Sequence, residues 1–419
     1  MVRRLSLAVS MLLAARLLPA QSFYLHNGDR VTFYGDSITA QRFYTRDVQD
    51  FVATRYPRLT VEFHNAGVPG DTVAGGYAGD AATRVNRDVK PWDPTVITVM
   101  LGMNDGDYVP PDPKIFADYQ AGYETLLGLL RDAAPAARIT LLENTPYDEI
   151  THGTEFKGFM ATTEQNARAT PALAARDHLP VVDTCSPVVQ LLQRAKSADP
   201  SFASLLVTDR IHPAEPTHWI VAASLMKAWH VDPVVTSVTI ASDTRAVTQS
   251  QRTTVTGVTG DRRRIEWEQR DEALPLPFNF DNELMNFVLS VSDLFSSDQE
   301  VLRVRGLRAG QYTLRIDSME VGNFSADELG RGINLATKKT PMWQQARDYD
   351  GELEQRSILE SADLTLTAGT HVADRMEGSR ILREGEAEFE QRAKDKLRLV
   401  SHHYVLTYVG TKNAGVVSR

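Results

Sequence analysis

The sequence contains a single cysteine, Cys185, among 419 residues. One thiol excludes disulfide bonds within the chain and excludes metal sites built from several cysteines. Cys185 follows an apolar run that is typical of a strand, where a small buried residue is expected; the alternative interpretation is a nucleophile. We therefore expect packing, and not covalent cross-links, to hold the fold together.

The chain also lacks an excess of basic residues. Its formal net charge is -9 and its isoelectric point is about 5.6. This charge argues against nucleic acid and acidic membrane surfaces as partners. With 42% hydrophobic and 24% charged residues, the composition is that of an ordinary soluble protein, and its length suggests two or three domains.

The apolar run near the N-terminus, from Leu5 to Leu18, is shorter than the roughly 20 residues that span a bilayer. Arg3 and Arg4 precede it, and Pro19-Ala20 closes it. This pattern predicts a signal peptide over residues 1–20, a secreted or periplasmic protein, and no membrane insertion of the mature chain. The arginine pair leaves the export route open, since a positive start is common to all such signals.

Segments typical of strands and helices alternate through the first half of the chain. The predicted strands cover residues 29–34, 59–63, 95–101, 138–143 and 179–183. Helices are expected between them, including one over residues 78–89 and one over residues 113–133. Such alternation predicts an α/β domain in which helices cover both faces of a parallel sheet. We expect this domain to span residues 21–233.

From Val234 onward, short alternating segments indicate antiparallel strands, with helices expected at 342–360 and 384–397. We therefore predict a second, β-rich α+β domain over residues 234–419. No flexible spacer separates the halves, so we expect them to pack together and the second domain to border the active-site mouth. The polar segment from Val321 to Pro341 is predicted to be irregular apart from a turn of helix within residues 327–335.

The stretch VTFYGDSITA, residues 31–40, organises the first domain. Its residues predict a strand, a tight turn at Gly35-Asp36-Ser37, and then a helix. A serine at such a turn lies at the carboxyl edge of the sheet, where open α/β proteins place their sites. Ser37 is therefore a candidate nucleophile, although the same letters also fit a simple helix cap.

Three further segments are expected at the carboxyl ends of later strands, near the same edge: a glycine-rich loop with Gly70, Asn104 in GMND, and Asp209 and His212 in DRIHP. A carboxylate three residues before a histidine can reach Nδ1 of the ring, which leaves Nε2 to accept the proton of Ser37. The backbone N–H groups of Ser37 and Gly70 and the amide of Asn104 are candidate donors to an oxyanion.

Each segment alone has a structural alternative. GMND fits a turn at a strand end, DRIH fits a helix cap followed by a surface histidine, and GVPGDT fits a capping loop. Their occurrence together, in this order, favours the catalytic interpretation.

These four blocks, GDSIT, NAGVPGDT, GMND and DRIHP, resemble those of the SGNH (GDSL-like) hydrolase family, over roughly residues 29–232. The resemblance implies a three-layer α/β/α, flavodoxin-like fold and ester hydrolysis without a cofactor. It also implies a triad of Ser37, His212 and Asp209 and an oxyanion hole of Ser37, Gly70 and Asn104. GDSIT in place of GDSL is the form common in the acetylesterase-like branch.

We therefore expect a secreted serine esterase acting on O-acyl, above all O-acetyl, esters of small molecules or glycans. A lipase, lysophospholipase or thioesterase of the same family, and a non-catalytic glycan-binding protein on the same scaffold, are the alternatives. The remaining histidines are scattered, so no metal is expected. Trp219 and Tyr147 fit either a substrate pocket or the core. The sequence leaves the alcohol, the acyl length, the oligomeric state and the second domain's role open.

Overall fold

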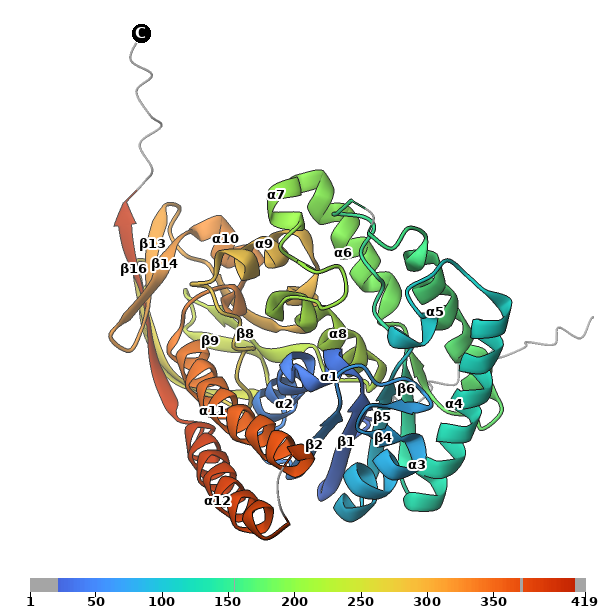
Figure 1. Cartoon of the computed structure of the whole chain (residues 1–419). Coiled ribbons are helices and arrows are strands. Elements are labelled where there is room, and N and C mark those ends of the chain that lie inside the picture. Colours follow the sequence, from blue (N-terminus) through green and yellow to red (C-terminus); the bar gives the residue numbers. More distant parts are fainter. Residues whose placement is uncertain (1–21, 154, 370–371, 411–419) are drawn as a thin grey trace, which may run out of the picture.

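The structure is a computed structural model that describes residues 22–153, 155–369 and 372–410. The predicted signal peptide, residues 1–20, lies outside the described residues. Figure 1 shows the chain as an α/β body at one side, with a β-rich region and a pair of long helices at the other.

A five-stranded sheet of parallel strands, in the order β2-β1-β5-β6-β7, forms the centre of the α/β body. Its central strand β5 is a buried run of β-branched and aliphatic residues, as expected of a strand covered on both faces. The bounds are β1 (Asp29–Gly35), β2 (Val61–Gly67), β5 (Val96–Met100), β6 (Arg138–Leu142) and β7 (Val181–Val182).

Two separate apolar clusters lie on the two faces of this sheet. On one face Val31 and Phe33 of β1 pack with one helical layer, and on the other face Tyr34 packs with the opposite layer. The first layer consists of α1 (Ser37–Ala40), α2 (Phe43–Arg55), α6 (Cys185–Ala198), α7 (Pro200–Ala203) and α8 (Glu215–Ala228). The second consists of α3 (Ala81–Arg84), the π-helix η1 (Val85–Val89), α4 (Pro113–Ala133) and α5 (Phe159–Ala175).

This arrangement confirms the predicted three-layer α/β/α fold. Two local predictions were wrong. The helix expected from Ala78 to Val89 begins only at Ala81, because Gly79–Asp80 (β4) pairs with Gly75–Gly76 (β3) in a small hairpin. The helix expected directly after β1 is interrupted at Arg42, whose backbone is left-handed at φ 66°.

The C-terminal region contains two further sheets that enclose their own apolar core. One sheet has the order β10-β11-β16-β13-β14 and is antiparallel throughout; the other has the order β15-β12-β8-β9. These two sheets confirm the prediction that the chain is rich in β-strands from Val234 onward. The bounds are β8 (Val234–Ala241), β9 (Ala246–Gln251), β10 (Thr253–Gly260), β11 (Arg264–Asp271), β12 (Gln299–Arg305), β13 (Gln311–Ile316), β14 (Met319–Ser325), β15 (Ile333–Asn334) and β16 (Ser401–Gly410).

The C-terminal region also contains the helices α9 (Glu283–Val291), α10 (Ala326–Arg331), α11 (Pro341–Gly369) and α12 (Val372–Lys396). Short 3-10 helices occur along the chain at η2 (Lys90–Trp92), η3 (Asn104–Gly106), η4 (Leu294–Ser297) and η5 (Leu335–Thr337). The prediction for the Val321–Pro341 segment was wrong at its start, where a strand replaces the expected irregular backbone. Its first residues belong to β14, which pairs with β13. The turn of helix expected within residues 327–335 is present as α10, which a capping box at Ser325 and Glu328 starts.

The two halves of the chain share one apolar core. Leu276, Phe278 and Met285, from the segment between β11 and α9, lie in the same cluster as Phe51 of α2 and Trp219 of α8. The expectation that the halves pack together is therefore met at the level of individual side chains.

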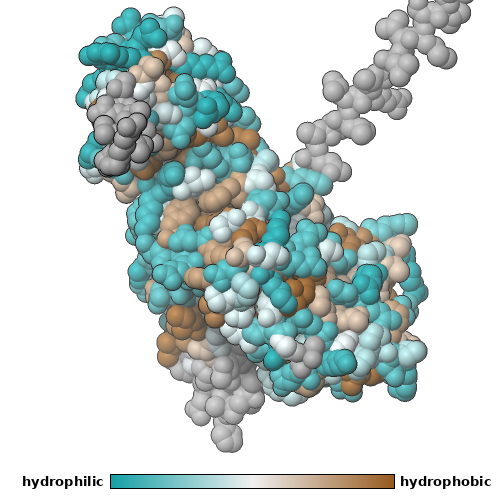
Figure 2. Space-filling view, turned by 90° about the horizontal axis from the view of Figure 1, so that it is seen from above, coloured by the Kyte–Doolittle hydropathy of each residue, from teal (hydrophilic) through white to brown (hydrophobic). Residues whose placement is uncertain are grey.

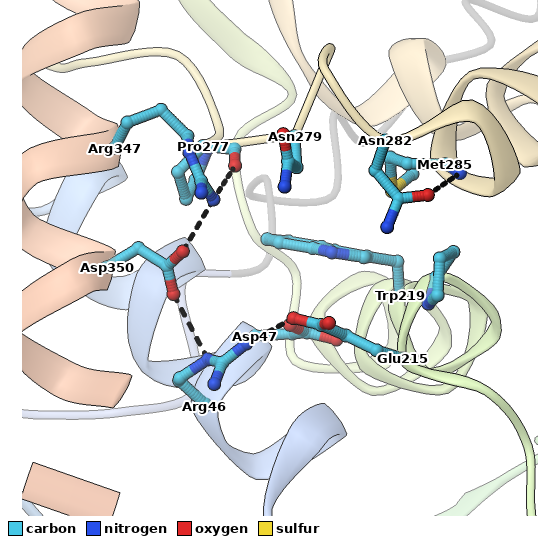
Figure 3. A pocket seen from close by; sticks show the side chains of 11 residues that line it. Arg46, Asp47, Glu215, Trp219, Pro277, Asn279, Asn282, Met285, Arg347 and Asp350 are labelled. Carbon is cyan, nitrogen blue, oxygen red and sulfur yellow. Dashed lines mark hydrogen bonds and ion pairs between the residues drawn. The ribbon is translucent and has the colours of Figure 1, made fainter. Parts of the chain in front are cut away.

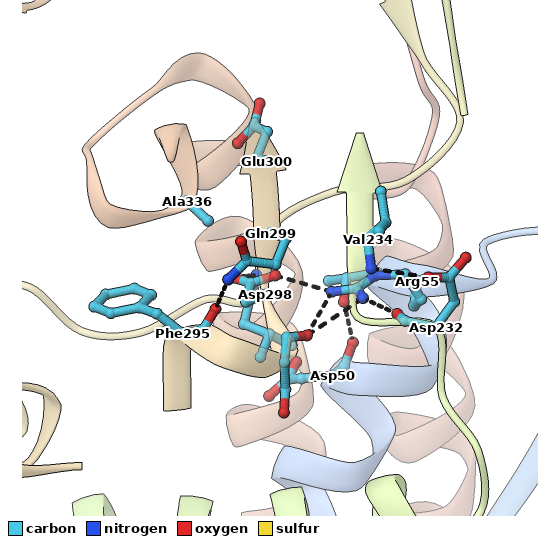
Figure 4. A network of polar contacts seen from close by, with 12 residues as sticks. Asp50, Arg55, Asp232, Val234, Phe295, Asp298, Gln299, Glu300 and Ala336 are labelled. Atoms are coloured by element: carbon cyan, nitrogen blue, oxygen red, sulfur yellow. Dashed lines mark hydrogen bonds and ion pairs between the residues drawn. The ribbon is translucent and has the colours of Figure 1, made fainter. Parts of the chain in front are cut away.

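A buried ion pair joins the halves at a second point. Arg55, the last residue of α2, contacts the carboxylate of Asp298 at 2.9 Å, and both side chains are fully buried. The same guanidinium also donates to the carbonyl oxygen of Asp232, two residues before the C-terminal region begins at Val234 (Figure 4).

Helix α11 reaches back across α2 and provides a third connection. Asp350 of α11 lies 3.1 Å from Arg46 of α2 and also pairs with Arg347, beside a small polar cavity that Trp219 lines (Figure 3). Further along α11, Glu360 pairs with Arg42 at 2.5 Å. Since only Gln41 separates Arg42 from the end of α1, the C-terminal region touches the segment that begins at Ser37.

In the described ranges, no helix combines the length and the apolar composition that crossing a membrane requires.

Candidate active site

Ser37 is the first residue of α1, immediately beyond the carboxyl end of β1. Asp36 caps this helix by accepting a hydrogen bond from the N–H of Ile38 at 2.9 Å. Since the first N–H groups of a helix have no intrahelical partner, the N–H of Ser37 remains a donor at the site. Gly35 permits the sharp turn, because a Cβ there would lie 2.1 Å from Oγ1 of Thr39.

His212 reaches this serine from the loop between α7 and α8. Its Nε2 lies 2.7 Å from Oγ of Ser37, and its Nδ1 lies 2.6 Å from Oδ2 of Asp209. Asp209 and His212 were expected at the end of a strand, and that placement was wrong. Leu206 and Val207 are buried in the core in irregular backbone, not in a strand.

Asp209 fixes both the ring and the backbone of the histidine segment. While Oδ2 meets the ring, Oδ1 accepts hydrogen bonds from the N–H groups of Ile211 at 2.9 Å and His212 at 2.7 Å. Arg210, between Asp209 and Ile211, has a left-handed backbone with φ 68°, and this conformation lets the chain turn around the carboxylate of Asp209.

Burial acts to raise the pKa of Asp209, but the hydrogen bonds from the His212 backbone, the His212 ring and the Ile211 backbone outweigh it and hold that pKa below its ordinary value. The group therefore stays ionised at neutral pH. An ionised Asp209 accepts a hydrogen bond from Nδ1–H of His212, which leaves Nε2 free to accept the hydroxyl proton of Ser37.

Buried His218 supports the histidine loop from behind. Its Nδ1 accepts a hydrogen bond from the N–H of Tyr44 at 3.3 Å, and its Nε2 lies 3.1 Å from the carbonyl oxygen of Pro213. Burial lowers the pKa of His218 to about 3, so this ring stays neutral and holds the residue that follows His212.

The loop that carries Gly70 lies beside the serine turn. Val68 donates a hydrogen bond to the carbonyl oxygen of Gly35 at 3.0 Å, which places the loop next to the end of β1. Gly70 has a φ of 75°, a conformation that favours glycine. Within the described part of the chain no hydrogen bond joins Gly70 to Ser37, His212 or Asn104.

Asn104 begins η3, beyond the carboxyl end of β5, and contacts that loop directly. Its Nδ2 donates to the carbonyl oxygen of Asp71 at 2.8 Å, and its Oδ1 accepts from the hydroxyl of Tyr108 at 2.9 Å. A primary amide carries two N–H groups, so these bonds leave one N–H of Asn104 for a substrate.

Buried charges hold the loop in place. Arg84 contacts Oδ2 of Asp71 at 2.5 Å and donates to the carbonyl oxygen of Ala66 at 2.6 Å. Asp105 accepts from the N–H of Val73 at 2.9 Å, which ties the loop to η3. Burial raises the pKa of Asp105 to about 7 and that of Asp36 to about 7.

The sequence interpretation missed Tyr108, Arg84 and Asp105 as parts of the site. Nothing in the spacing of these residues distinguishes them from ordinary polar residues, because their contacts depend on how the loops meet. Trp219 and Tyr147, considered for a substrate pocket, are both buried in the core.

Cys185 is also buried, and burial raises the pKa of its thiol to about 12, which fits the structural interpretation. Among the described residues, no group of three or more His, Cys, Asp or Glu side chains is arranged to hold a metal ion.

Residues 33–220 match the model of the GDSL-like Lipase/Acylhydrolase family. No curated protein matches the chain.

Among solved structures, the chain is similar to a gut microbial diltiazem-metabolizing enzyme, with 24% identity and a TM-score of 0.78 over 92% of this chain and 98% of the other. It is also similar to an acetylxylan esterase from Geobacillus stearothermophilus, in the structure of a catalytic mutant, with 23% identity and a TM-score of 0.40 over 50% of this chain and 97% of the other.

Proposed function

Through residues 33–220 the chain belongs to the GDSL-like lipase/acylhydrolase family of ester hydrolases, and we propose that it is a secreted serine esterase that removes O-acyl groups. O-acetyl groups on carbohydrate are the favoured substrates. The hydrogen-bonded series from Asp209 through His212 to Ser37, with separations of 2.6 and 2.7 Å, carries this proposal.

The geometry supports a two-step reaction. Oγ of Ser37 attacks the carbonyl carbon of the ester while Nε2 of His212 takes the hydroxyl proton. When the bond to the alcohol breaks, His212 returns the proton to the departing oxygen, and the acyl group remains on Ser37. Water activated by His212 then attacks the acyl-enzyme, and the carboxylic acid leaves.

Negative charge develops on the carbonyl oxygen in both steps. The N–H of Ser37, the N–H of Gly70 and the remaining amide N–H of Asn104 are the donors that we assign to it. Gly70 belongs to this set because its loop is tied to the ends of both β1 and β5, through Val68 and Asp71.

The alternative within the family is a lipase, lysophospholipase or thioesterase, which needs an extended apolar surface for a long acyl chain. Figure 2 shows the molecule from the upper side of Figure 1, the side on which α1 lies above β1. That face is mostly hydrophilic, and its hydrophobic residues form small separate patches. This surface favours short acyl groups on polar alcohols. The other alternative, a non-catalytic glycan-binding protein, has no use for the Asp209–His212–Ser37 contacts.

A substrate panel tests the proposal. Full-length mature protein and a Ser37→Ala control are assayed on p-nitrophenyl esters of increasing chain length, on acetylated xylan and other acetylated glycans, and on diltiazem. We expect kcat/KM to be highest for acetyl esters and to fall as the chain lengthens. If kcat/KM were highest for acyl chains of eight or more carbons, the lipase alternative would hold. If the protein bound glycans but hydrolysed none of the esters, the binding-protein alternative would hold.

Export is the second part of the proposal, and it rests on the arginine pair and short apolar run of residues 1–20. Expression of the full chain with its natural start should yield extracytoplasmic protein that begins near Gln21. Recovery of the intact N-terminus from the cytoplasm would contradict it.

A further inference from the structure

The side chain of Asn104 is held at both ends, and the two contacts together determine which way its amide faces. The carbonyl oxygen of Asp71 can only accept a hydrogen bond, so the atom opposite it, at 2.8 Å, must be the NH2 group. At the other end the hydroxyl of Tyr108 donates to Oδ1 at 2.9 Å. Turning the amide by 180° would place two carbonyl oxygens against each other.

The orientation matters because the two ends of an amide have opposite effects on an oxyanion. An N–H stabilises the developing negative charge, whereas a carbonyl oxygen in the same position repels it. An amide that is free to rotate would spend part of its time in the wrong orientation or pointing away. A preorganised donor avoids this loss at the moment of reaction.

The position of Tyr108 is itself unusual. Both Asp107 and Tyr108 have left-handed backbones, at φ 51° and 56°. A left-handed backbone is strained in residues other than glycine, and such strain is found most often at functional sites. Two consecutive strained residues are the means by which a side chain only four positions from Asn104 turns back to meet it.

Two phenylalanines hold the ring of Tyr108 in place. Its centroid lies 4.9 Å from the ring centroid of Phe159 and 5.1 Å from that of Phe156. Burial, with the nearby charges of Asp36 and Asp209, raises the pKa of the Tyr108 hydroxyl. The hydroxyl therefore keeps its proton under working conditions and remains a donor.

We propose that Tyr108 is a positioning residue for the ester hydrolysis assigned above, and that its hydroxyl orients the Asn104 amide so that the free N–H faces the oxyanion. This inference rests on the proposed function. It gives Tyr108 no direct contact with the reacting atoms, so its effect passes entirely through Asn104.

The test compares Tyr108→Phe with the wild type on p-nitrophenyl acetate. Phenylalanine keeps the ring and its packing and removes only the hydroxyl. We expect kcat to fall about tenfold with KM changed less than twofold, because the lost hydrogen bond serves the transition state more than the bound ester. Unchanged kcat, or an effect confined to KM, would overturn the proposal.

A double variant provides the readout that a merely structural role would not give. In a protein that already carries Asn104→Ala, Tyr108→Phe should cause no further fall in kcat, because the group that it orients is absent. If the two effects multiplied instead, Tyr108 would act independently of Asn104, and the proposal would be wrong.

Tyr147→Phe is the matched control. Tyr147 packs on the same two phenylalanines, at 5.2 Å from Phe159 and 6.1 Å from Phe156, and its hydroxyl accepts a hydrogen bond from the N–H of Phe156. Its kcat should stay within twofold of wild type. A tenfold loss in this control as well would assign the Tyr108→Phe effect to general disturbance of the aromatic cluster and so overturn the inference.

Failure of this inference can be told apart from failure of the proposed function. If Ser37→Ala abolishes hydrolysis while Tyr108→Phe has normal kcat, only the role of Tyr108 is wrong. If Ser37→Ala remains active, the assignment of the triad is wrong, and so is the role of Tyr108 that depends on it.

Discussion

Asp209 holds its histidine with more contacts than a side-chain pair alone would supply. One oxygen meets the imidazole and the other binds two backbone N–H groups, so the carboxylate sets the ring position and the loop conformation together. With about half of its side chain exposed, Asp209 depends on these hydrogen bonds, and not on burial, to stay ionised.

The side-chain amide of Asn104 is one of the proposed oxyanion donors, so its removal should slow the reaction. Asn104→Ala should lower kcat by roughly 10² to 10³ with a small change in KM, because an oxyanion donor binds the transition state more strongly than the ground state. Steady-state kinetics on p-nitrophenyl acetate measure both constants. A change in KM alone would instead make Asn104 a substrate-binding residue.

The main catalytic candidates could be identified from the sequence because each lies in a short motif with its own chemistry. Ser37, Asn104 and the pair of Asp209 and His212 were identified without coordinates. Tyr108 could not be, because its contact with Asn104 depends on two left-handed backbone conformations. Neither Asp107 nor Tyr108 is a glycine, so the sequence carried no signal for such a turn.

At the scale of elements, Asp105 links the loop after β2 to η3. Its Oδ1 binds the N–H of Val73, while its Oδ2 is buried and has no hydrogen-bond partner among the described residues. A buried carboxyl group in this position favours the protonated form, and burial raises its pKa to about 7.

This gives a prediction for stability against pH. Because the folded-state pKa is raised, the stabilising contribution of Asp105 is complete below pH about 4 and is lost as the pH rises to about 7. Relative to Asp105→Asn, the wild type should lose free energy of unfolding at up to about 1.4 kcal/mol per pH unit in this window.

Urea unfolding at intervals from pH 4 to 8 measures that difference. Asp107→Asn, an exposed change in the same turn, is the control for altering the turn without altering Asp105. A wild-type to Asp105→Asn difference that stays constant across the window would contradict the assignment of a raised pKa.

Elements could be predicted where local signals agree with tertiary packing. Helix α4 starts and ends where expected, since Asp112 caps it by accepting from the N–H groups of Lys114 and Ile115 and Pro113 occupies its first position. Strand β14 was missed because its polar residues form a strand only through pairing with β13. The opposite error occurred at Leu206 and Val207, where a strand was expected and none forms. Apolar residues can be buried without forming a strand.

At the scale of the whole molecule, the C-terminal region completes the core of the α/β body. Phe278 packs against Trp219, with ring centroids 4.8 Å apart, and both belong to the cluster that covers one face of the parallel sheet. The absence of a flexible spacer in the sequence predicted this packing. Which side chains cross the interface could not be predicted, because it depends on the path of the segment before α9.

Truncation tests this dependence. A fragment of residues 21–233 loses Leu276, Phe278 and Met285 from the shared core, so we expect it to be insoluble or unfolded by circular dichroism. In the full chain, Phe278→Ala should reduce the free energy of unfolding by about 3 to 5 kcal/mol, whereas Val247→Ala on exposed β9 should have little effect. A soluble fragment with full activity on polymeric substrate would contradict the shared core.

The activity of Ser37→Ala on p-nitrophenyl acetate tests most directly whether Ser37 is the nucleophile. The hydroxyl is half-buried at the start of a short helix, so its loss should leave the circular dichroism spectrum and the melting temperature unchanged. We predict a fall in kcat of about 10⁶, with a small residual rate from the oxyanion donors. Ser197→Ala, on the exposed side of α6, should retain wild-type activity. A folded Ser37→Ala protein that keeps a tenth of the wild-type rate would show that Ser37 is not the nucleophile.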